Sequence, residues 1–322
     1  IFKAIKMSFE KDPDAEGDVS QFGALTTALS STIGTGNIIG VGTAIAMGGP
    51  GAVLWMWLTG IFGIATKYSE TLIALKYRVK SEDGSMIGGA MSALERGKNW
   101  KWLGIIFALL AAVCAFGIGC MVQSNSIGSV FETAFGVPAW AIGIVLVVIC
   151  AIIFLGGVQR LASVCEKLVP IMAALLLACA AIILICRMKY IPATFGMIFR
   201  YAFKPQAIIG GAFGAALKAA ISQGAKRGLF SNEAGMGSTP HAHAQANVEH
   251  PHDQGVVAMA GVFIDTFVVL TLNALVIIST LYTADGPLHA MGAAAASTAI
   301  NKANLAQTAF GTVFGSGFGA MF

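Results

Sequence analysis

The chain has 322 residues, of which 56% are hydrophobic and only 11% are charged, and its mean hydropathy is +0.77. A soluble domain carries roughly a quarter charged residues, so this composition excludes that class and indicates a polytopic membrane protein. The formal net charge of +4 is too small and too dispersed to favour a nucleic-acid partner.

Apolar windows of about twenty residues, enough to cross about 30 Å of hydrocarbon, predict seven membrane spans and the start of an eighth near Phe314. The seven spans cover residues 21–47, 52–75, 103–131, 138–155, 161–186, 207–224 and 256–281. Because the chain begins at Ile1 and stops as a new apolar run starts, we expect a fragment cut at both ends. We therefore expect one incomplete transmembrane transporter domain over residues 1–322.

Lys and Arg near the span ends predict the orientation, since basic residues concentrate in cytoplasmic loops. Most of them fall on one side if residues 1–20 are cytoplasmic. The segments then predicted to be cytoplasmic are 1–20, 79–101, 156–167 and 226–254, and the outer ones are 48–51, 136–137, 187–206 and 282–309. A cell-membrane protein with several spans and its first segment inside is the expected topology.

The first span is interrupted by the polar stretch from Gly34 to Asn37. Backbone that leaves the helix inside hydrocarbon loses its hydrogen bonds, and it persists only where it lines a cavity or holds a ligand. A packing kink is the plainer alternative. Carbonyls freed at such a break suit Na⁺, and the N-terminus of the resuming helix suits a carboxylate.

A second glycine-rich stretch, residues 210–214, lies in the sixth span, five spans after the first break. Transporters often consist of two inverted halves that each open with a discontinuous helix. The pattern predicts a five-helix repeat over residues 21–186 and the start of an inverted repeat over 187–322. Gly211 and Phe213 become candidate substrate-binding residues, although glycine also serves close helix packing.

Polar residues inside other spans are further candidates. Gln123 lies in a polar island of the third span, either facing the cavity or bonding to a neighbouring helix. Lys218 and Asp265 are intramembrane charges, which either pair with each other or act in gating and coupling. Lys67 and Glu70 stand three residues apart and are expected to form a local ion pair.

The segment after the sixth span is expected to form a cytoplasmic gate or re-entrant turn. Ser231 or Asn232 is predicted to cap a helix, with Glu233 in its first turn, and Asn232 and Glu233 are gating candidates. The four histidines that follow have spacing that could suit a metal, but no acidic or cysteine partner has clear ligand spacing, so a metal site is rejected. These histidines are His241, His243, His250 and His252.

Several strings together resemble the alanine or glycine:cation symporter family, the sodium:alanine symporters. The resemblance follows the family's order along nearly the whole chain. The strings are GTGNIIGV at 34–41, GGPGAVLWMW at 48–57, MVQSNS at 121–126, RGLFSNEAGMG at 227–237 and FIDT at 263–266. Leu54 and the segment after Gly89 depart from the family pattern without changing the assignment.

The resemblance implies an all-α membrane protein with leucine-transporter-type inverted five-helix repeats whose first helices are broken. By position, Thr35, Gly36, Asn37 and Gln123 resemble substrate-site residues. The unwound carbonyls of Thr32, Ile33 and Gly34 resemble part of the sodium site. The remaining sodium ligands are expected on helices of the same protein that this chain lacks.

The predicted function is therefore secondary active import of alanine or glycine coupled to Na⁺, by alternating access in the lipid bilayer. Na⁺ is the co-transported ion, no cofactor is expected, and the protein is not expected to be an enzyme. Proton-coupled transport is an alternative. A passive channel and a metal-dependent membrane enzyme that uses the histidine segment are the rivals from other functional classes.

Overall fold

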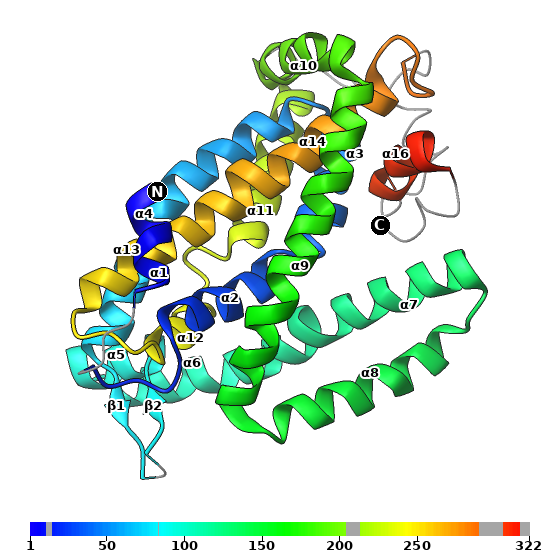
Figure 1. Ribbon diagram of the computed structural model, residues 1–322. Coiled ribbons are helices and arrows are strands. Elements are labelled where there is room, and N and C mark those ends of the chain that lie inside the picture. Colours follow the sequence, from blue (N-terminus) through cyan, green and yellow to red (C-terminus); the bar gives the residue numbers. More distant parts are fainter. Residues whose placement is uncertain (11–14, 83, 204–212, 290–304, 316–322) are drawn as a thin grey trace.

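The computed structural model describes residues 1–10, 15–82, 84–203, 213–289 and 305–315. Within these ranges the fold is all-α apart from one short antiparallel hairpin, in which Val79 pairs with Ile87 and Lys80 with Met86 (Figure 1).

The elements of the first half, in chain order, are α1 (Phe2–Ser8), α2 (Gln21–Thr32), η1 (Gly36–Gly40), α3 (Val41–Gly48), α4 (Ala52–Lys76), β1 (Val79–Lys80), β2 (Met86–Ile87), α5 (Ala90–Lys98), α6 (Lys101–Cys114), η2 (Ala115–Met121), α7 (Val122–Phe135) and α8 (Ala139–Phe154). Those of the second half are α9 (Gly157–Cys186), η3 (Met188–Tyr190), α10 (Ile191–Phe203), α11 (Phe213–Asn232), α12 (Pro240–Ala244), α13 (Pro251–Val262), η4 (Phe263–Leu270), α14 (Thr271–Ile277), η5 (Ile278–Tyr282) and α16 (Leu305–Phe314). The elements η1, η2, η4 and η5 are π-helical turns within longer helices.

Helix lies over each predicted span where the structure describes it. In the described part of the chain, three helices are long and apolar enough to cross a membrane, namely Lys101–Phe135, Gly157–Cys186 and Pro251–Tyr282. The sixth predicted span is shifted, because α11 continues to Asn232, eight residues beyond the expected end at 224. The helix α16 ends at Phe314, and the residues after 315, into which the expected eighth span would run, fall outside the described ranges.

A closely packed core surrounds α4, along which both α11 and α13 run (Figure 1). Glycines of α11 permit this approach: a Cβ on Gly224 would lie 2.5 Å from the Ala52 carbonyl oxygen and 2.6 Å from Trp55 Cβ. Large apolar side chains from α3, α4, α9, η4 and α14 fill the space between the core helices, and all are fully buried. They include Ile45, Met56, Ile183, Leu270 and Ile277.

The helices from α6 to α8 depart from this packing. Figure 1 shows α7 and α8 side by side and extending away from α4 and α13. No residue in the most apolar window of Lys101–Phe135 is buried. Apolar side chains with no protein cover are expected where a helix faces lipid or another part of the same protein.

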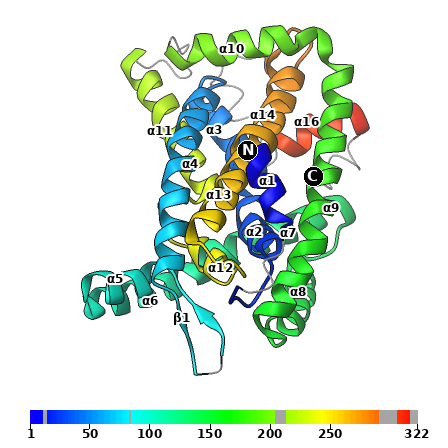
Figure 2. The ribbon, with the colours of Figure 1, turned by 60° about the vertical axis from the view of Figure 1, so that its left-hand side comes forward.

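Several short elements lie in segments that the sequence predicted only as loops. The hairpin and α5 fall within 79–101, and α10 falls within 187–206. In α10, Thr194, Ile198 and Ala202 are buried at four-residue spacing, whereas Phe199 and Phe203 are more than half exposed. This one-sided burial makes α10 a surface helix, and it lies across one end of the molecule in Figure 2.

Candidate functional site

The broken helix is present, and the predicted interruption is confirmed. Ser20 caps α2 by accepting a hydrogen bond from the Gly23 amide at 2.8 Å. The helix ends at Thr32, Ile33 has extended backbone with φ −79° and ψ 94°, and η1 begins at Gly36. No backbone amide in the described ranges donates to the carbonyl oxygens of Thr32 and Ile33.

A cavity of about 770 Å³ opens beside this break. Residues 30–36 form one wall, and Gln123 of α7 faces them, because a Cβ on Gly34 would lie 3.8 Å from the Gln123 Oε1 atom. The Thr35 hydroxyl is buried and has no hydrogen-bond partner in the described structure. The cavity therefore brings together an unsatisfied hydroxyl, a side-chain amide and carbonyls that lack donors. Its further lining includes Ile118, Val130, Met172, Phe230 and Glu233.

The Asn37 side chain does not line this cavity; it lies in a fully buried polar cluster with Ser231 and Asp265. Asn37 Nδ2 donates to the carbonyl oxygen and to Oδ1 of Asp265, both at 3.0 Å. The Ser231 hydroxyl donates to Asn37 Oδ1 at 2.9 Å, and it also lies 3.0 Å from Asp265 Oδ2. These contacts join the broken helix to the end of α11 and to η4. They do not support the direct substrate contact predicted for Asn37.

Two further residues that were not predicted complete the cluster. The Thr266 hydroxyl donates to Asp265 Oδ2 at 3.1 Å, and Asn273 Nδ2 of α14 donates to the Asn37 carbonyl oxygen at 2.6 Å. Both are polar residues inside an apolar helix, which was the available sequence signal. The cluster satisfies the Asp265 carboxylate, as a buried charge requires.

Lys218 and Asp265 do not pair. Lys218 is exposed on α11, and no ion pair within the described residues joins it to the fully buried carboxylate. The pairing failed as a prediction because Asn37 of η1, Ser231 of α11 and the neighbouring Thr266 already surround Asp265.

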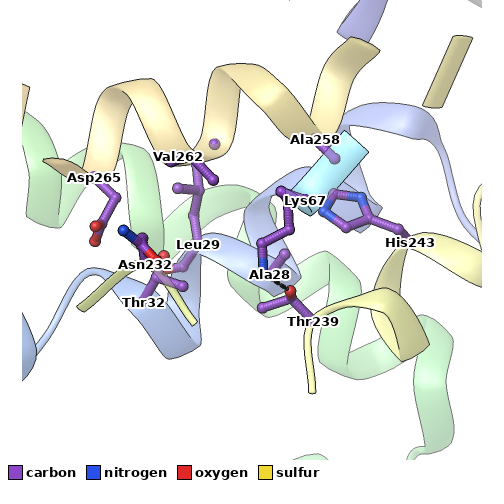
Figure 3. A pocket seen from close by; sticks show the side chains of 11 residues that line it. Ala28, Leu29, Thr32, Lys67, Asn232, Thr239, His243, Ala258, Val262 and Asp265 are labelled. Carbon is purple, nitrogen blue, oxygen red and sulfur yellow. Dashed lines mark hydrogen bonds between the residues drawn. The ribbon is translucent and has the colours of Figure 1, made fainter. Parts of the chain in front are cut away.

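The buried cation near the break is instead Lys67 of α4. Its ammonium group donates to the Glu233 carbonyl oxygen at 3.0 Å and to the Thr239 hydroxyl. Lys67 Nζ also lies 3.9 Å from Glu70 Oε2, which confirms the predicted ion pair. Figure 3 shows Lys67 directed at Thr239, in a cavity of about 10 Å³ that Asn232, His243 and Asp265 also line. That volume is about the size needed for one water molecule.

The turn after α11 differs from the expected helix start. Ser231 and Asn232 form the last turn of α11, so they end a helix and do not cap the beginning of one. Asn232 Oδ1 accepts a hydrogen bond from the Ala234 amide at 3.0 Å, and Glu233 has the left-handed φ of 52°. The Glu233 carboxylate accepts hydrogen bonds from Ser238 at 2.5 Å and from Ser31 at 3.3 Å. Glu233 thus ties the turn to the end of α2.

The proposed second break is largely outside the described residues. These exclude Gly211 and the rest of the break up to residue 212, and Phe213 is the first residue of α11.

The histidines have separate partners. Gln254 Nε2 donates to His243 Nδ1 at 2.8 Å, Tyr68 forms a hydrogen bond with His252, and His241 contacts Phe107 edge-on. His243 is fully buried, and burial together with the nearby Lys67 charge lowers its pKa from 6.5 to about 3.

Comparison with known proteins identifies the family. A model of the sodium:alanine symporter family matches residues 1–322. This chain belongs to the sodium:alanine symporter family.

The sodium/alanine symporter AgcS of Methanococcus maripaludis is 46% identical over 85% of this chain and 61% of its own length. The putative sodium/proton-dependent alanine carrier YrbD of Bacillus subtilis is 39% identical over 97% of this chain and 64% of its own length. The probable sodium/glutamine symporter GlnT of Bacillus subtilis is 39% identical over 82% of this chain and 54% of its own length. The chain thus spans less than two thirds of the length of these relatives.

Proposed function

We propose that the protein containing this chain imports a small neutral amino acid, with alanine as the first candidate, together with Na⁺ by alternating access. Family membership and the sodium-linked names of AgcS, YrbD and GlnT support this function. The observation that carries the proposal is the broken helix, because its unsatisfied polar groups face a cavity large enough for an amino acid.

The substrate is proposed to lie between the break and Gln123. The carboxylate group would meet backbone amides at the start of η1, around Gly36, where the helix dipole favours an anion. The Thr35 hydroxyl and the Gln123 amide are the side chains available for the remaining polar groups. Asn37 is proposed as a positioning residue, because it holds the η1 backbone against Ser231 and Asp265.

Na⁺ is proposed to bind the carbonyls of Thr32 and Ile33, with Gly34 adjacent, and with further ligands from parts of the protein beyond this chain. Sodium bound there would order the same backbone that contacts the substrate. Each ligand would then raise the affinity for the other by the same factor.

The turn after α11 is the proposed gate. Glu233 lines the main cavity and bonds to Ser31, while Lys67 holds its carbonyl group from α4. Asn232 links this turn to η4, because its side-chain amide donates a hydrogen bond to the Thr266 hydroxyl, which in turn donates to Asp265. We further propose that residues 1–20 lie in the cytoplasm and that the protein belongs to the cell membrane. Residues 21–186 and 187–322 are proposed to belong to inverted repeats.

The test is equilibrium binding of radiolabelled alanine to the purified full-length protein in NaCl and in choline chloride. We expect saturable binding in NaCl, at least tenfold weaker binding in choline, and a loss of about 1–3 kcal/mol of binding free energy for Gln123→Leu. Gln159→Leu is the matched control, because Gln159 is exposed and outside the cavity. Equal binding in both salts would contradict sodium coupling, and unchanged binding by Gln123→Leu would contradict the substrate position. Competition by glycine and glutamine would define the substrate range.

A further inference from the structure

A second large cavity lies outside the candidate transport site, between the C-terminal end of α4 and α5. Its volume is about 540 Å³. Most of its wall is apolar, with Leu72 and Ile73 on the α4 side and Ala93 and Leu94 on the α5 side. Neither the proposed substrate path nor the Asp265 cluster uses this space.

Two lysines from different helices border this apolar cavity. Lys76 is the last residue of α4 and Lys98 is the last residue of α5, and both are exposed. No carboxylate within the described residues forms an ion pair with either of them. Glu70, which also lines the cavity, pairs with Lys67.

The neighbouring residues keep the charge at the mouth positive. Arg96 is also exposed on α5, while Glu95 is paired with Lys101 at 3.8 Å. The cavity mouth therefore presents cationic groups to an anion, and its interior is mostly apolar. This combination suits an amphiphile with an anionic head.

The adjoining surface has the character of a membrane interface. Trp100 and Trp102 are 49% and 63% exposed, where the chain passes from α5 into the apolar helix α6. Tryptophan concentrates at the level of lipid headgroups. Beyond it, Ile105, Leu109 and Val113 form an exposed apolar row at four-residue spacing, as expected for a helix that faces acyl chains.

We propose that this cavity binds an anionic phospholipid, with an acyl chain inside and the phosphate between Lys76 and Lys98. Clustered basic residues beside a membrane-spanning helix recognise anionic headgroups in this way. The charge pattern favours this occupant over a further segment of the protein. One phosphate group would neutralise both lysines, whereas a covering segment would need a separate acidic partner for each.

The bound lipid would touch the turn that follows α11. Gly237 and Pro240 form part of the cavity wall, and Thr239 between them accepts the hydrogen bond from Lys67. Lipid binding would thus stabilise this turn. This site goes beyond the proposed transport function and does not depend on which amino acid is carried.

The test is native mass spectrometry of the full-length protein, titrated with phosphatidylglycerol or phosphatidylcholine. We expect one phosphatidylglycerol to bind at least tenfold more tightly than phosphatidylcholine. Lys76→Gln combined with Lys98→Gln should weaken that binding about tenfold. Ala93→Trp, which fills the apolar part, should remove it.

Lys189→Gln is the matched control for the charge substitutions. Lys189 Nζ lies 5.7 Å from the centre of the Tyr190 ring, much as Lys76 Nζ lies 5.6 Å from that of Tyr77, but Lys189 is outside this cavity. The control should bind phosphatidylglycerol as the wild type does. The proposal is overturned if the wild type shows no headgroup preference, if Lys189→Gln weakens binding as much as the double variant, or if Ala93→Trp leaves binding unchanged.

Discussion

Asn37 contacts three elements that lie far from it in the sequence. Its side chain contacts η4 through Asp265 and α11 through Ser231, and its carbonyl group accepts a hydrogen bond from Asn273 of α14. All four residues are almost fully buried. Removing one partner from such a cluster leaves the others unsatisfied, which costs more than the bond itself contributes.

We therefore predict that Asn37→Ala lowers the free energy of unfolding by about 1–3 kcal/mol as well as reducing transport. Thermal unfolding of the full-length protein in detergent measures the first effect. Asn125→Ala is the control, because Asn125 is exposed on α7. An unfolding temperature equal to that of the wild type would show that the cluster is not a stabilising contact.

His243 makes stability depend on pH. Its pKa is about 3 in the folded protein against 6.5 for an ordinary histidine, because burial and the Lys67 charge disfavour the protonated ring. The unfolded chain therefore binds the proton more readily. The stability contribution is complete above pH 6.5 and is lost progressively as the pH falls from 6.5 towards 3.

We predict that the unfolding temperature falls between pH 7 and pH 5, and that His243→Gln reduces this fall. His250→Gln is the control, because the side chain of His250 is 70% exposed. A series of thermal melts in matched buffers measures the effect. The same slope in wild type and His243→Gln would assign the pH dependence to other groups.

At the scale of single residues, the sequence was informative where the chemistry is local. The break at Gly34, the Lys67–Glu70 pair and the unusual Asp265 could be recognised along the chain. The remote partners of Asp265 could not, since Asn37 and Ser231 meet it only through the packing of η1 and α11 on η4. The supposed partner Lys218 lies on α11 as well, but it is exposed.

Between elements, glycine determines how closely α11 approaches α4. Gly224 lies against Ala52 and Trp55, whereas a Cβ on Gly143 of α8 would meet nothing within 4 Å. Alanine in place of a helical glycine gains about 1 kcal/mol of intrinsic helix stability. At Gly224, but not at Gly143, a steric clash with the backbone of α4 opposes that gain.

We predict that Gly224→Ala destabilises the protein by about 1–3 kcal/mol, whereas Gly143→Ala is neutral or stabilising. Unfolding of both variants under the same conditions provides the comparison. Equal unfolding temperatures for the two variants would contradict the close packing of α11 on α4.

Element prediction succeeded where apolar runs are long. Windows of twenty residues identified each long helix, including the broken one. They missed α5 and α10, because helices of 9 and 13 residues are too short to fill such a window. The end of α11 was misplaced because its last turns carry Lys226, Arg227 and Asn232.

At the scale of the whole molecule, two regions differ in burial. The bundle of α2, α4, α9, α11, α13 and α14 is packed around polar contacts at the break, whereas the most apolar part of Lys101–Phe135 is exposed. The main cavity lies between these regions, with the break on one side and Gln123 on the other. Movement of one region relative to the other would open or close the cavity, as alternating access requires.

The most direct test of sodium coupling is uptake of radiolabelled alanine by proteoliposomes that contain the full-length protein. With an inward Na⁺ gradient, alanine should accumulate above its external concentration, and a sodium ionophore should abolish the excess. An inward proton gradient with choline outside should give no such accumulation. Alanine uptake that stops at equilibrium, or that is equally concentrative without Na⁺, would contradict the account.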